Sequence, residues 1–377
     1  MGAPAPQADA IPGHPVSFAD LPGFAEDDHA AALQTFRASC GPIVAHAPAL
    51  RAASPVPPAL VTLCKAALAL PATPGEEVAR TFFETHFAPR RLDPGFLTGY
   101  YEPVVDGSLT ATSEFSTPLL GRPPDLVGGV PGQPIAGLDP ALSAARRLPD
   151  GHLAPYPDRA AIDGGALGPL APPLVYVRDP VEAFFIHVQG SARVRLPDGT
   201  MRRLVYAGRN GQPYTSIGRA LVEQLNIPPA EMGMAQLKAW IRAHGQKPGE
   251  AGATLMQRNR SYIFFAFDDT LAPGAGPIGG AGVSLTPLRS LAIDRLIWPY
   301  GLPVFIDATL PWRTDTPEPF RRLLVAQDTG SAIVGPARGD IFFGSGPDAA
   351  RLAGPIRHPG TFFVLWPRDE DEAGTSK

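Results

Sequence analysis

Apolar residues recur in the first quarter of the chain at the three- and four-residue spacing of amphipathic helices. This pattern predicts helices over residues 28–40, 58–70 and 75–87. Glu76 and Glu77 fall in the first turn of the third helix, where negative charge is favourable. Residues 1–25, which precede these helices, are rich in Pro and Ala, and we expect them to form an extended arm.

Most of the remaining chain shows the short apolar runs, bounded by Gly and Pro, that are typical of β-strands. Residues 192–206 alternate on both sides of Asp198-Gly199, a dipeptide that favours a tight hairpin turn. Further strands are expected at 96–105, 174–179, 183–190, 262–267, 303–307, 321–328, 331–335, 340–344 and 361–366, with helices at 217–225, 229–244 and 347–353. The pattern therefore predicts a mainly β fold with N-terminal helices.

Composition agrees with this interpretation and excludes some functions. The chain has 377 residues, 44% of them hydrophobic, which is enough for two domains with their own cores. Its 46 Pro and 40 Gly suit short strands joined by turns better than a helical bundle. The net charge of -4 does not favour a nucleic-acid partner, because such proteins usually carry a basic face. No apolar run approaches the length of a membrane span.

Two features of the chain leave its compartment open. Residues 1–6 lack the basic and apolar regions of a secretory signal, so we expect either a cytoplasmic protein or an exported one whose signal is not part of this sequence. Cys40 and Cys64 are the only cysteines. They could be buried thiols, or they could form one disulfide between two N-terminal helices, which would imply an oxidising compartment.

No motif in the sequence predicts a metal or an organic cofactor. Gly274, Gly276 and Gly279 match a dinucleotide-binding spacing, but the helix needed to hold a pyrophosphate does not follow them, so we expect a loop. The eight His lack metal-ligand spacing, and no Cys-x-x-Cys pair occurs. His187 is expected on a strand face with Phe185 and Gln189, either packed or lining a glycan site.

The candidate chemistry comes from carboxylates embedded in apolar strands. Asp294, Asp307, Asp328 and Asp340 each adjoin such a run. Burial of a carboxyl group, with another carboxylate nearby, raises its pKa and keeps it protonated near neutrality. An acid that protonates a glycosidic oxygen needs this property. The alternative is that these aspartates cap turns at strand ends.

At these residues the chain resembles the lytic murein transglycosylase A (MltA) family. The matching segments, in family order, are TGYYEP (98–103), FIHVQGS (185–191), YAGRNGQPY (206–214), NRSYIFF (259–265), QDTGSAI (327–333) and GDIFFG (339–344), together with Asp294. They extend over about residues 95–366. The N-terminal helical part matches less distinctively.

The resemblance implies a mainly β fold of two domains. Residues 26–103 and 251–377 would form a double-psi β-barrel with the N-terminal helices and three aspartates (the 3D domain). Residues 104–250 would form a smaller, inserted β-barrel-like domain, the other wall of a glycan groove. Family members are typically exported to the periplasmic side of the envelope and often anchored to the outer membrane. This chain begins with neither an export signal nor a lipidation cysteine. The resemblance also favours a Cys40–Cys64 disulfide.

The resemblance further assigns roles to site residues. Asp340 matches the catalytic acid, and Asp328 and Asp294 match supporting carboxylates whose roles are open. Candidate glycan-binding residues are Thr98, Tyr100, Tyr101, Gln189, Gly190, Ser191, Tyr206, Asn210, Tyr214, Gly330 and Ser331. The tyrosines could stack on sugar rings, and the polar side chains could bind hydroxyl and acetamido groups.

The implied activity is cleavage of peptidoglycan by a lytic transglycosylase. One carboxyl group suffices, because the C6 hydroxyl of N-acetylmuramic acid is the nucleophile and a 1,6-anhydro end is formed. A hydrolase that activates water with Glu102 or Asp328, and a barrel that binds peptidoglycan without cutting it, are the alternatives. The expected partners are glycan strands and other cell-wall enzymes, with the protein a monomer. Endo or exo action and the need for stem peptides stay open.

Overall fold

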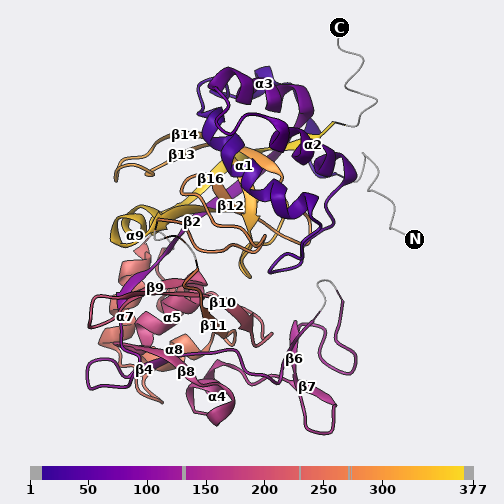
Figure 1. Cartoon of the computed structure of the whole chain (residues 1–377). Helices are drawn as coiled ribbons and strands as arrows, with labels where there is room; N and C mark the ends of the chain where they lie inside the picture. Colours follow the sequence, from indigo (N-terminus) through magenta and orange to yellow (C-terminus); the bar gives the residue numbers. More distant parts are fainter. Residues whose placement is uncertain (1–10, 130–132, 229–230, 271, 273, 369–377) are drawn as a thin grey trace. The chain divides into compact units, whose positions relative to one another are not determined.

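The computed structural model describes residues 11–129, 133–228, 231–270, 272 and 274–368 (Figure 1). The chain divides into two compact units. The first comprises Met1–Tyr100, Ile278–Gly344 and Arg351–Lys377, and the second comprises Tyr101–Pro277 and Ser345–Ala350. The second unit extends beyond the boundary at 250 expected from the sequence, because residues 251–277 supply a helix and a strand that pack within it.

A closed β-barrel forms the centre of the first unit. Its strands follow the order β2-β15-β12-β14-β13-β16, and β16 pairs back with β2 to close it. The bounds are β2 Phe87–Glu102, β12 Ser290–Ala292, β13 Pro303–Leu310, β14 Glu318–Asp328, β15 Arg338–Ser345 and β16 Arg357–Pro367. α9 (Pro347–Ala353) lies between the last two strands in sequence. The barrel expected from the resemblance is therefore confirmed.

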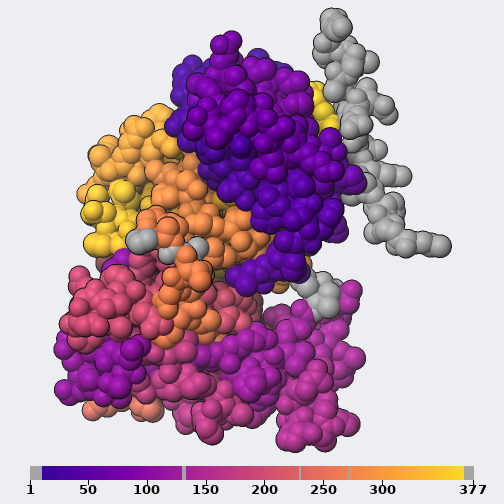
Figure 2. All heavy atoms as spheres, viewed as in Figure 1, coloured from indigo at the N-terminus to yellow at the C-terminus, as the bar shows by residue number. Residues whose placement is uncertain are grey.

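The three predicted N-terminal helices are present, as α1 (His29–Val44), α2 (Pro58–Ala69) and α3 (Glu76–His86). The side chain of Asp28 caps α1 by accepting a hydrogen bond from the Ala31 N–H. A disulfide joins Cys40 in α1 to Cys64 in α2, with their Cα atoms 4.8 Å apart. α1 packs on β14 and α2 on β16. Within this unit the indigo helices and the orange-to-yellow strands form one continuous surface (Figure 2).

The segment before α1 is packed on the barrel and is not an extended arm in its described part. β1 (His14–Pro15) pairs with β2, and the 3-10 helix η2 (Phe18–Asp20) follows. Leu21 and Phe24 are buried. These apolar side chains interrupt the Pro- and Ala-rich composition and anchor the segment. Residues 1–10 of the expected arm lie outside the described residues.

The second unit combines small sheets with helices. One sheet has the order β11-β10-β9-β3, and two further sheets contain β4-β8 and β5-β6-β7. The strands are β3 Val104–Asp106, β4 Thr117–Leu120, β5 Leu126–Gly128, β6 Ala144–Arg147, β7 Leu153–Pro155, β8 Pro173–Val177, β9 Ala192–Arg195, β10 Met201–Arg209 and β11 Ile263–Phe267. The helices are α4 Arg159–Asp163, η3 Gly168–Leu170, α5 Pro180–Gln189, α6 Ile217–Leu225, α7 Met234–Ala243 and α8 Ala251–Gln257. Helices α5 to α8 share a hydrophobic core.

The strand predicted at 183–190 is wrong, because these residues form α5. Asp179 caps this helix by accepting the Glu182 N–H, Pro180 occupies its first position, and Gly190 ends it at a φ of +86°. Ala183 to Ile186 are all buried, so the helix has no polar face at this point and its sequence is a continuous apolar run.

Other local predictions had mixed outcomes. The hairpin around Asp198-Gly199 is confirmed, since β9 and β10 pair and Gly199 has a φ of +85°. No strand forms at 331–335, and α8 was not predicted. The helix expected at 229–244 begins at Met234 in the structure, while residues 229 and 230 are outside the described part. Across the described ranges, no helix has the length and apolar character needed to cross a membrane.

Candidate active site

Two of the predicted carboxylates lie on the strands flanking β12. Ala292 in β12 pairs with Asp328 in β14 on one side and with Asp340 in β15 on the other. Adjacent strands are separated by about 4.8 Å, so the two aspartates are about 10 Å apart at their Cα atoms. Only the methyl group of Ala292 stands between them in this row.

The side chains of Thr98 and Tyr100 show that both carboxylates face the same side of the barrel wall. These residues are two apart on β2 and therefore project to one face. Thr98 Oγ1 lies 2.6 Å from Asp340 Oδ1, and Tyr100 Oη lies 2.9 Å from Asp328 Oδ2. Alternate residues of one strand thus hold the two aspartates in a single site.

The hydrogen bonds around Asp340 define where its proton sits. Arg338 Nη2 donates to Thr98 Oγ1 at 2.8 Å. A guanidinium only donates, so the single hydroxyl proton of Thr98 points to Asp340 Oδ1. Because Oδ1 accepts this bond, a protonated Asp340 carries its own proton on Oδ2. That oxygen is the one placed to donate to a ligand.

Burial controls the acidity of Asp340. The pKa of this carboxyl group is raised to about 6, mainly by loss of hydration and to a smaller extent by the charge of Asp328. The Arg338 guanidinium and the Thr98 hydrogen bond oppose this rise. Asp340 is therefore protonated in mildly acid solution and still able to release its proton near neutrality, as an acid that later becomes a base requires.

Asp328 is held as a hydrogen-bond acceptor. Its Oδ2 accepts from Tyr100 Oη, and its Oδ1 accepts from the Gly280 N–H at 2.8 Å. Burial raises the pKa of Asp328, while the charge of Arg51 and these hydrogen bonds work against the rise. The backbone position of Gly280 is close-packed, because an added Cβ would lie 2.4 Å from Tyr300 Oη. The site thus fixes both oxygens of Asp328 from different parts of the chain.

Gln327, the neighbour of Asp328, projects away from the site. Its Nε2 donates to Thr35 O and to Ser39 Oγ in α1, both at 2.9 Å. Its Oε1 accepts a hydrogen bond from Ser290 Oγ. Gln327 is completely buried and fastens β14 to the N-terminal helices. The alternation along β14 therefore places an amide in the core and a carboxylate in the site.

Asp294 has a structural position. Its Oδ1 accepts from the Leu296 N–H at 3.0 Å, and its Oδ2 accepts from the Gly335 N–H at 2.8 Å. These bonds close a turn after β12 and hold the loop between β14 and β15. The sequence left the role of Asp294 open, and the geometry favours a structural role. The loop so held contains two candidate glycan-binding residues, Gly330 and the exposed Ser331.

Two candidate glycan-binding residues have other roles in the structure. Tyr100 is 9% exposed and packs on Phe342 at a ring distance of 5.3 Å, so its face is not available for a sugar. Asn210 is completely buried, and its amide binds the backbone of Pro157, Arg260 and Tyr262. Packing or backbone bonding thus already uses the group that would bind, which argues against a glycan contact at either residue.

The second unit brings together four of the remaining candidates. Gln189 Oε1 accepts a hydrogen bond from the Tyr101 N–H at 3.0 Å, and Gly190 and Ser191 follow Gln189 directly. His187, expected on the same strand face, is instead buried inside this unit on α5. Tyr206 and Tyr214 are partly exposed residues elsewhere in the unit.

Glu102 does not have the surroundings of a base that activates water. It is completely buried in the second unit, where Arg193 Nε and Ser345 Oγ each lie 2.6 Å from its Oε2. Arg203 Nε lies 3.7 Å from Oε1. Two guanidinium groups and a hydroxyl thus surround the Glu102 carboxylate inside the fold and leave no room for an attacking water to be the partner that it holds.

Arg338, Arg51 and Gly280 belong to the site but were not predicted from the sequence. Arg338 was detectable in principle, because it precedes Asp340 by two residues on a strand and so shares its face. Arg51 and Gly280 are contributed by loops far from Asp328 in sequence, and no local pattern marks them. Among the residues that the structure describes, no cluster of three or more His, Cys, Asp or Glu could hold a metal ion.

Solved structures of other proteins share this architecture. The membrane-bound lytic murein transglycosylase from Agrobacterium tumefaciens is 38% identical, with a TM-score of 0.83 over 94% of this chain and 97% of that one. This chain belongs to the MltA family. MltA from Neisseria gonorrhoeae, in its monoclinic form, is 32% identical, with a TM-score of 0.73 over 97% of this chain and 96% of that one.

Family models and a curated relative agree with membership of the MltA family. Residues 96–266 match the MltA-specific insert domain, and residues 289–366 match the 3D domain. The membrane-bound lytic murein transglycosylase A of Escherichia coli K12 is 31% identical over 274 residues, which are 71% of this chain and 64% of the relative. The alignment thus spans just under two thirds of that relative's length. The family expected from the sequence is confirmed.

Proposed function

We propose that this MltA-family chain is a peptidoglycan lytic transglycosylase. It would cleave the β-1,4 bond between N-acetylmuramic acid and N-acetylglucosamine and leave 1,6-anhydromuramic acid ends. The observation that carries the proposal is the environment of Asp340, a half-buried carboxyl group with its pKa raised to about 6 and one oxygen held by Thr98. Its relatives are named for this activity, which supports the same assignment.

In the first step Asp340 acts as general acid. Its Oδ2 proton passes to the glycosidic oxygen, and the bond between that oxygen and C1 of N-acetylmuramic acid breaks. The N-acetylglucosamine side leaves with a free hydroxyl, and positive charge develops at C1. The ionised Asp340 is stabilised by the Thr98 hydrogen bond and by the nearby Arg338 charge.

In the second step the same carboxylate acts as general base. It takes the proton of the C6 hydroxyl as that oxygen bonds to C1, which closes the 1,6-anhydro ring and restores protonated Asp340. The nucleophile belongs to the cleaved sugar, so its effective concentration is high and no water is consumed. A second catalytic carboxyl group, which ordinary glycoside hydrolases need, is not required.

Asp328 would support this reaction through its charge. One of its oxygens accepts a hydrogen bond from Tyr100 and the other accepts one from the Gly280 N–H, so Asp328 is held rigidly on the face that carries Asp340. A fixed negative charge there favours the positive charge that develops at C1. It also favours a protonated Asp340 in the resting site.

The glycan contacts and the location of the protein follow from the same proposal. The residues that remain candidates for glycan contact are Thr98, Tyr101, Gln189, Gly190, Ser191, Tyr206, Tyr214, Gly330 and Ser331.

The Cys40–Cys64 disulfide favours an oxidising compartment, and the relatives' names place them at a membrane. We therefore propose the periplasmic side of the cell envelope, with the protein a monomer acting on glycan strands.

Digestion of purified murein sacculi, followed by mass spectrometry of the muropeptides, tests the activity. The wild-type chain should release products one water lighter than reducing muropeptides, and Asp340→Asn should release none. Asp307→Asn is the matched control, because Asp307 is a barrel aspartate paired with Arg321 outside the site.

Two other outcomes would replace the proposal. Reducing muropeptides would show a hydrolase and would direct attention to Asp328, whose removal should then abolish turnover. A folded wild-type chain that sediments with sacculi and releases nothing would show a glycan-binding barrel without activity.

A further inference from the structure

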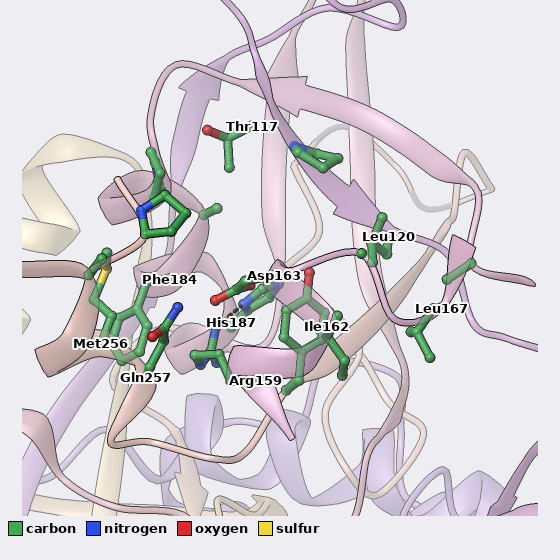
Figure 3. A pocket seen from close by; sticks show the side chains of 18 of the residues that line it. Thr117, Leu120, Arg159, Ile162, Asp163, Leu167, Phe184, His187, Met256 and Gln257 are labelled. Carbon is green, nitrogen blue, oxygen red and sulfur yellow. Dashed lines mark hydrogen bonds between the residues drawn. The ribbon is translucent and has the colours of Figure 1, made fainter. Parts of the chain in front are cut away.

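A cavity in the second unit lies outside the proposed catalytic site. It has a volume of about 420 Å³ and is lined by parts of α4, α5, α8 and the β4–β8 sheet. Figure 3 shows its walls. They are largely apolar and include Leu120, Ile162, Leu167, Phe184 and Met256. A volume of this size falls within the range of pockets that bind small molecules.

Arg159, in α4, forms part of this cavity and is 3% exposed. Its Nε donates to Asn259 O at 3.0 Å and its Nη2 to Ser261 O at 2.6 Å. The guanidinium also lies over the rings of Phe184 and Tyr262. Throughout the described ranges, no carboxylate oxygen lies within 4.0 Å of it. Neutral carbonyls and aromatic faces therefore surround a buried cation that forms no salt bridge with a described residue.

His187, in α5, accepts a hydrogen bond from Arg159 and helps to hold its guanidinium in the cavity wall. Its Nδ1 is 3.1 Å from Arg159 Nη1, and it is 5% exposed. A guanidinium cannot accept a hydrogen bond, so Nδ1 accepts and the neutral ring carries its proton on Nε2. Burial and the Arg159 charge keep the pKa of His187 well below its ordinary value, in agreement with a neutral ring. Nε2 is buried and has no partner in the described structure.

Asp163 supplies the opposite charge in the same cavity. It lies four residues after Arg159, at the end of α4, and its side chain reaches solvent. No hydrogen bond to its carboxylate is formed by the residues that the structure covers. In Figure 3, Asp163, His187 and Arg159 gather in one part of the cavity. A cation at the buried side thus faces a carboxylate at the accessible side without forming a salt bridge with it.

We propose that this cavity binds an α-amino acid zwitterion, either free or as the unlinked amino acid end of a wall peptide. The ligand carboxylate accepts hydrogen bonds from Arg159, and its ammonium group donates to Asp163. The apolar walls take the aliphatic side chain. Both charges then have a direct hydrogen-bonding partner. The wall-peptide source rests on the proposed function, whereas the recognition chemistry does not.

Calorimetric titration of the full chain with leucine and two matched analogues tests the recognition. Leucinamide lacks the carboxylate, and 4-methylpentanoate lacks the ammonium group. Leucine should bind, and each analogue should bind at least about tenfold more weakly, because hydrogen bonds to charged groups contribute about 1.5–3 kcal/mol. Leucine binding no better than 4-methylpentanoate, or no binding of any probe at millimolar concentration, would overturn the proposal.

Variants tie the binding to these side chains. Asp163→Asn should weaken leucine about tenfold and leave 4-methylpentanoate unchanged, because only the partner of the ammonium group is lost. Arg159→Lys should weaken both ligands. Asp269→Asn, at an exposed carboxylate paired with Arg202, is the control and should change neither. Arg159 also donates to two backbone carbonyls, so circular dichroism should check that the Arg159→Lys variant is folded. If that variant unfolds, the result for Asp163→Asn decides whether the cavity binds the zwitterion.

The source of the ligand is distinguished with muropeptides. A muropeptide whose peptide keeps a free α-amino acid end should bind the Asp340→Asn chain, and the same muropeptide with that carboxylate amidated should not. Binding of free leucine without binding of the muropeptide would contradict a wall-peptide source and leave a free amino acid as the ligand. Because the readout is binding by a catalytically silent chain, failure here is separable from failure of the transglycosylase proposal.

Discussion

The hydroxyl of Thr98 donates its only proton to Asp340 Oδ1 over 2.6 Å, because Arg338 occupies its acceptor position. This relationship fixes which oxygen of Asp340 carries the acid proton. It also couples the acid to a cation through a neutral hydroxyl, so the positive charge tunes Asp340 without forming a direct ion pair with it.

Replacing Thr98 with Val should lower kcat about ten- to a hundredfold with little change in KM. The variant removes a hydrogen bond to a charged group in the site while keeping the side-chain shape. It should also move the apparent pKa of Asp340 upward, since this hydrogen bond lowers it. Turnover of sacculi measured against pH gives both quantities. Thr98→Ser should restore them, and a Val variant with wild-type kcat and pKa would contradict the assigned role.

The activity should decrease as pH rises above about 6. Asp340 must start protonated, and its raised pKa of about 6 leaves about a tenth of the molecules in that form at pH 7. The logarithm of kcat/KM should therefore fall with a slope near -1 on the alkaline side. Arg338→Gln should shift the fall to higher pH, because the guanidinium lowers this pKa. A flat profile between pH 5 and 8 would be inconsistent with Asp340 as the acid.

Asp340→Asn should stabilise the protein at neutral pH while abolishing turnover. The folded-state pKa of about 6 lies above the ordinary 3.8, so the folded state binds the proton more tightly than the unfolded state. The stability contributed by the protonated form is present below pH 4 and is lost as pH rises to about 6, at a cost of up to about 3 kcal/mol. Urea denaturation at pH 4 and pH 8 should show the variant gaining stability only at pH 8. Equal effects at both pH values would argue against a buried acid.

Breaking the Cys40–Cys64 disulfide should destabilise the first unit. The bond closes a loop with a sequence separation of 24 residues, and a crosslink of this length contributes about 3 kcal/mol. Thermal melts with and without dithiothreitol measure the effect. The Cys40→Ser, Cys64→Ser double variant should melt at the lower temperature and be insensitive to the reductant, and a wild-type melt unchanged by dithiothreitol would contradict the prediction.

The sequence predicted β13, β14, β15, β16 and the end of β2, because these segments carry a clear alternation or apolar run, but it missed β12, which has only three residues. It failed at α5, since residues 183–187 are buried on every side of the helix, which removes the period that distinguishes a helix from a strand. The caps, Asp179 and Gly190, were the signal that could have corrected this assignment.

The sequence predicted residues of the site only where a charged side chain adjoins an apolar run. Asp340 and Asp328 stand out as charges beside apolar runs, but the pairing of both with Ala292 follows from the order of strands, which no local pattern gives. Asn210 shows the opposite case. It lies in a segment that matches the family, but its amide hydrogen-bonds to backbone groups inside the fold. His187 and Arg159, 28 residues apart, meet only through the packing of two helices.

The opposite directions of Gln327 and Asp328 make the proposed enzyme more sensitive to changes in chain length than to changes in side chain. Adjacent residues of a strand face opposite sides, so a one-residue insertion or deletion in β14 would turn the amide into the site and the carboxylate into the core. Substitutions on this strand would alter one contact at a time. A single insertion or deletion would move the carboxylate of this strand to the opposite side of the barrel wall.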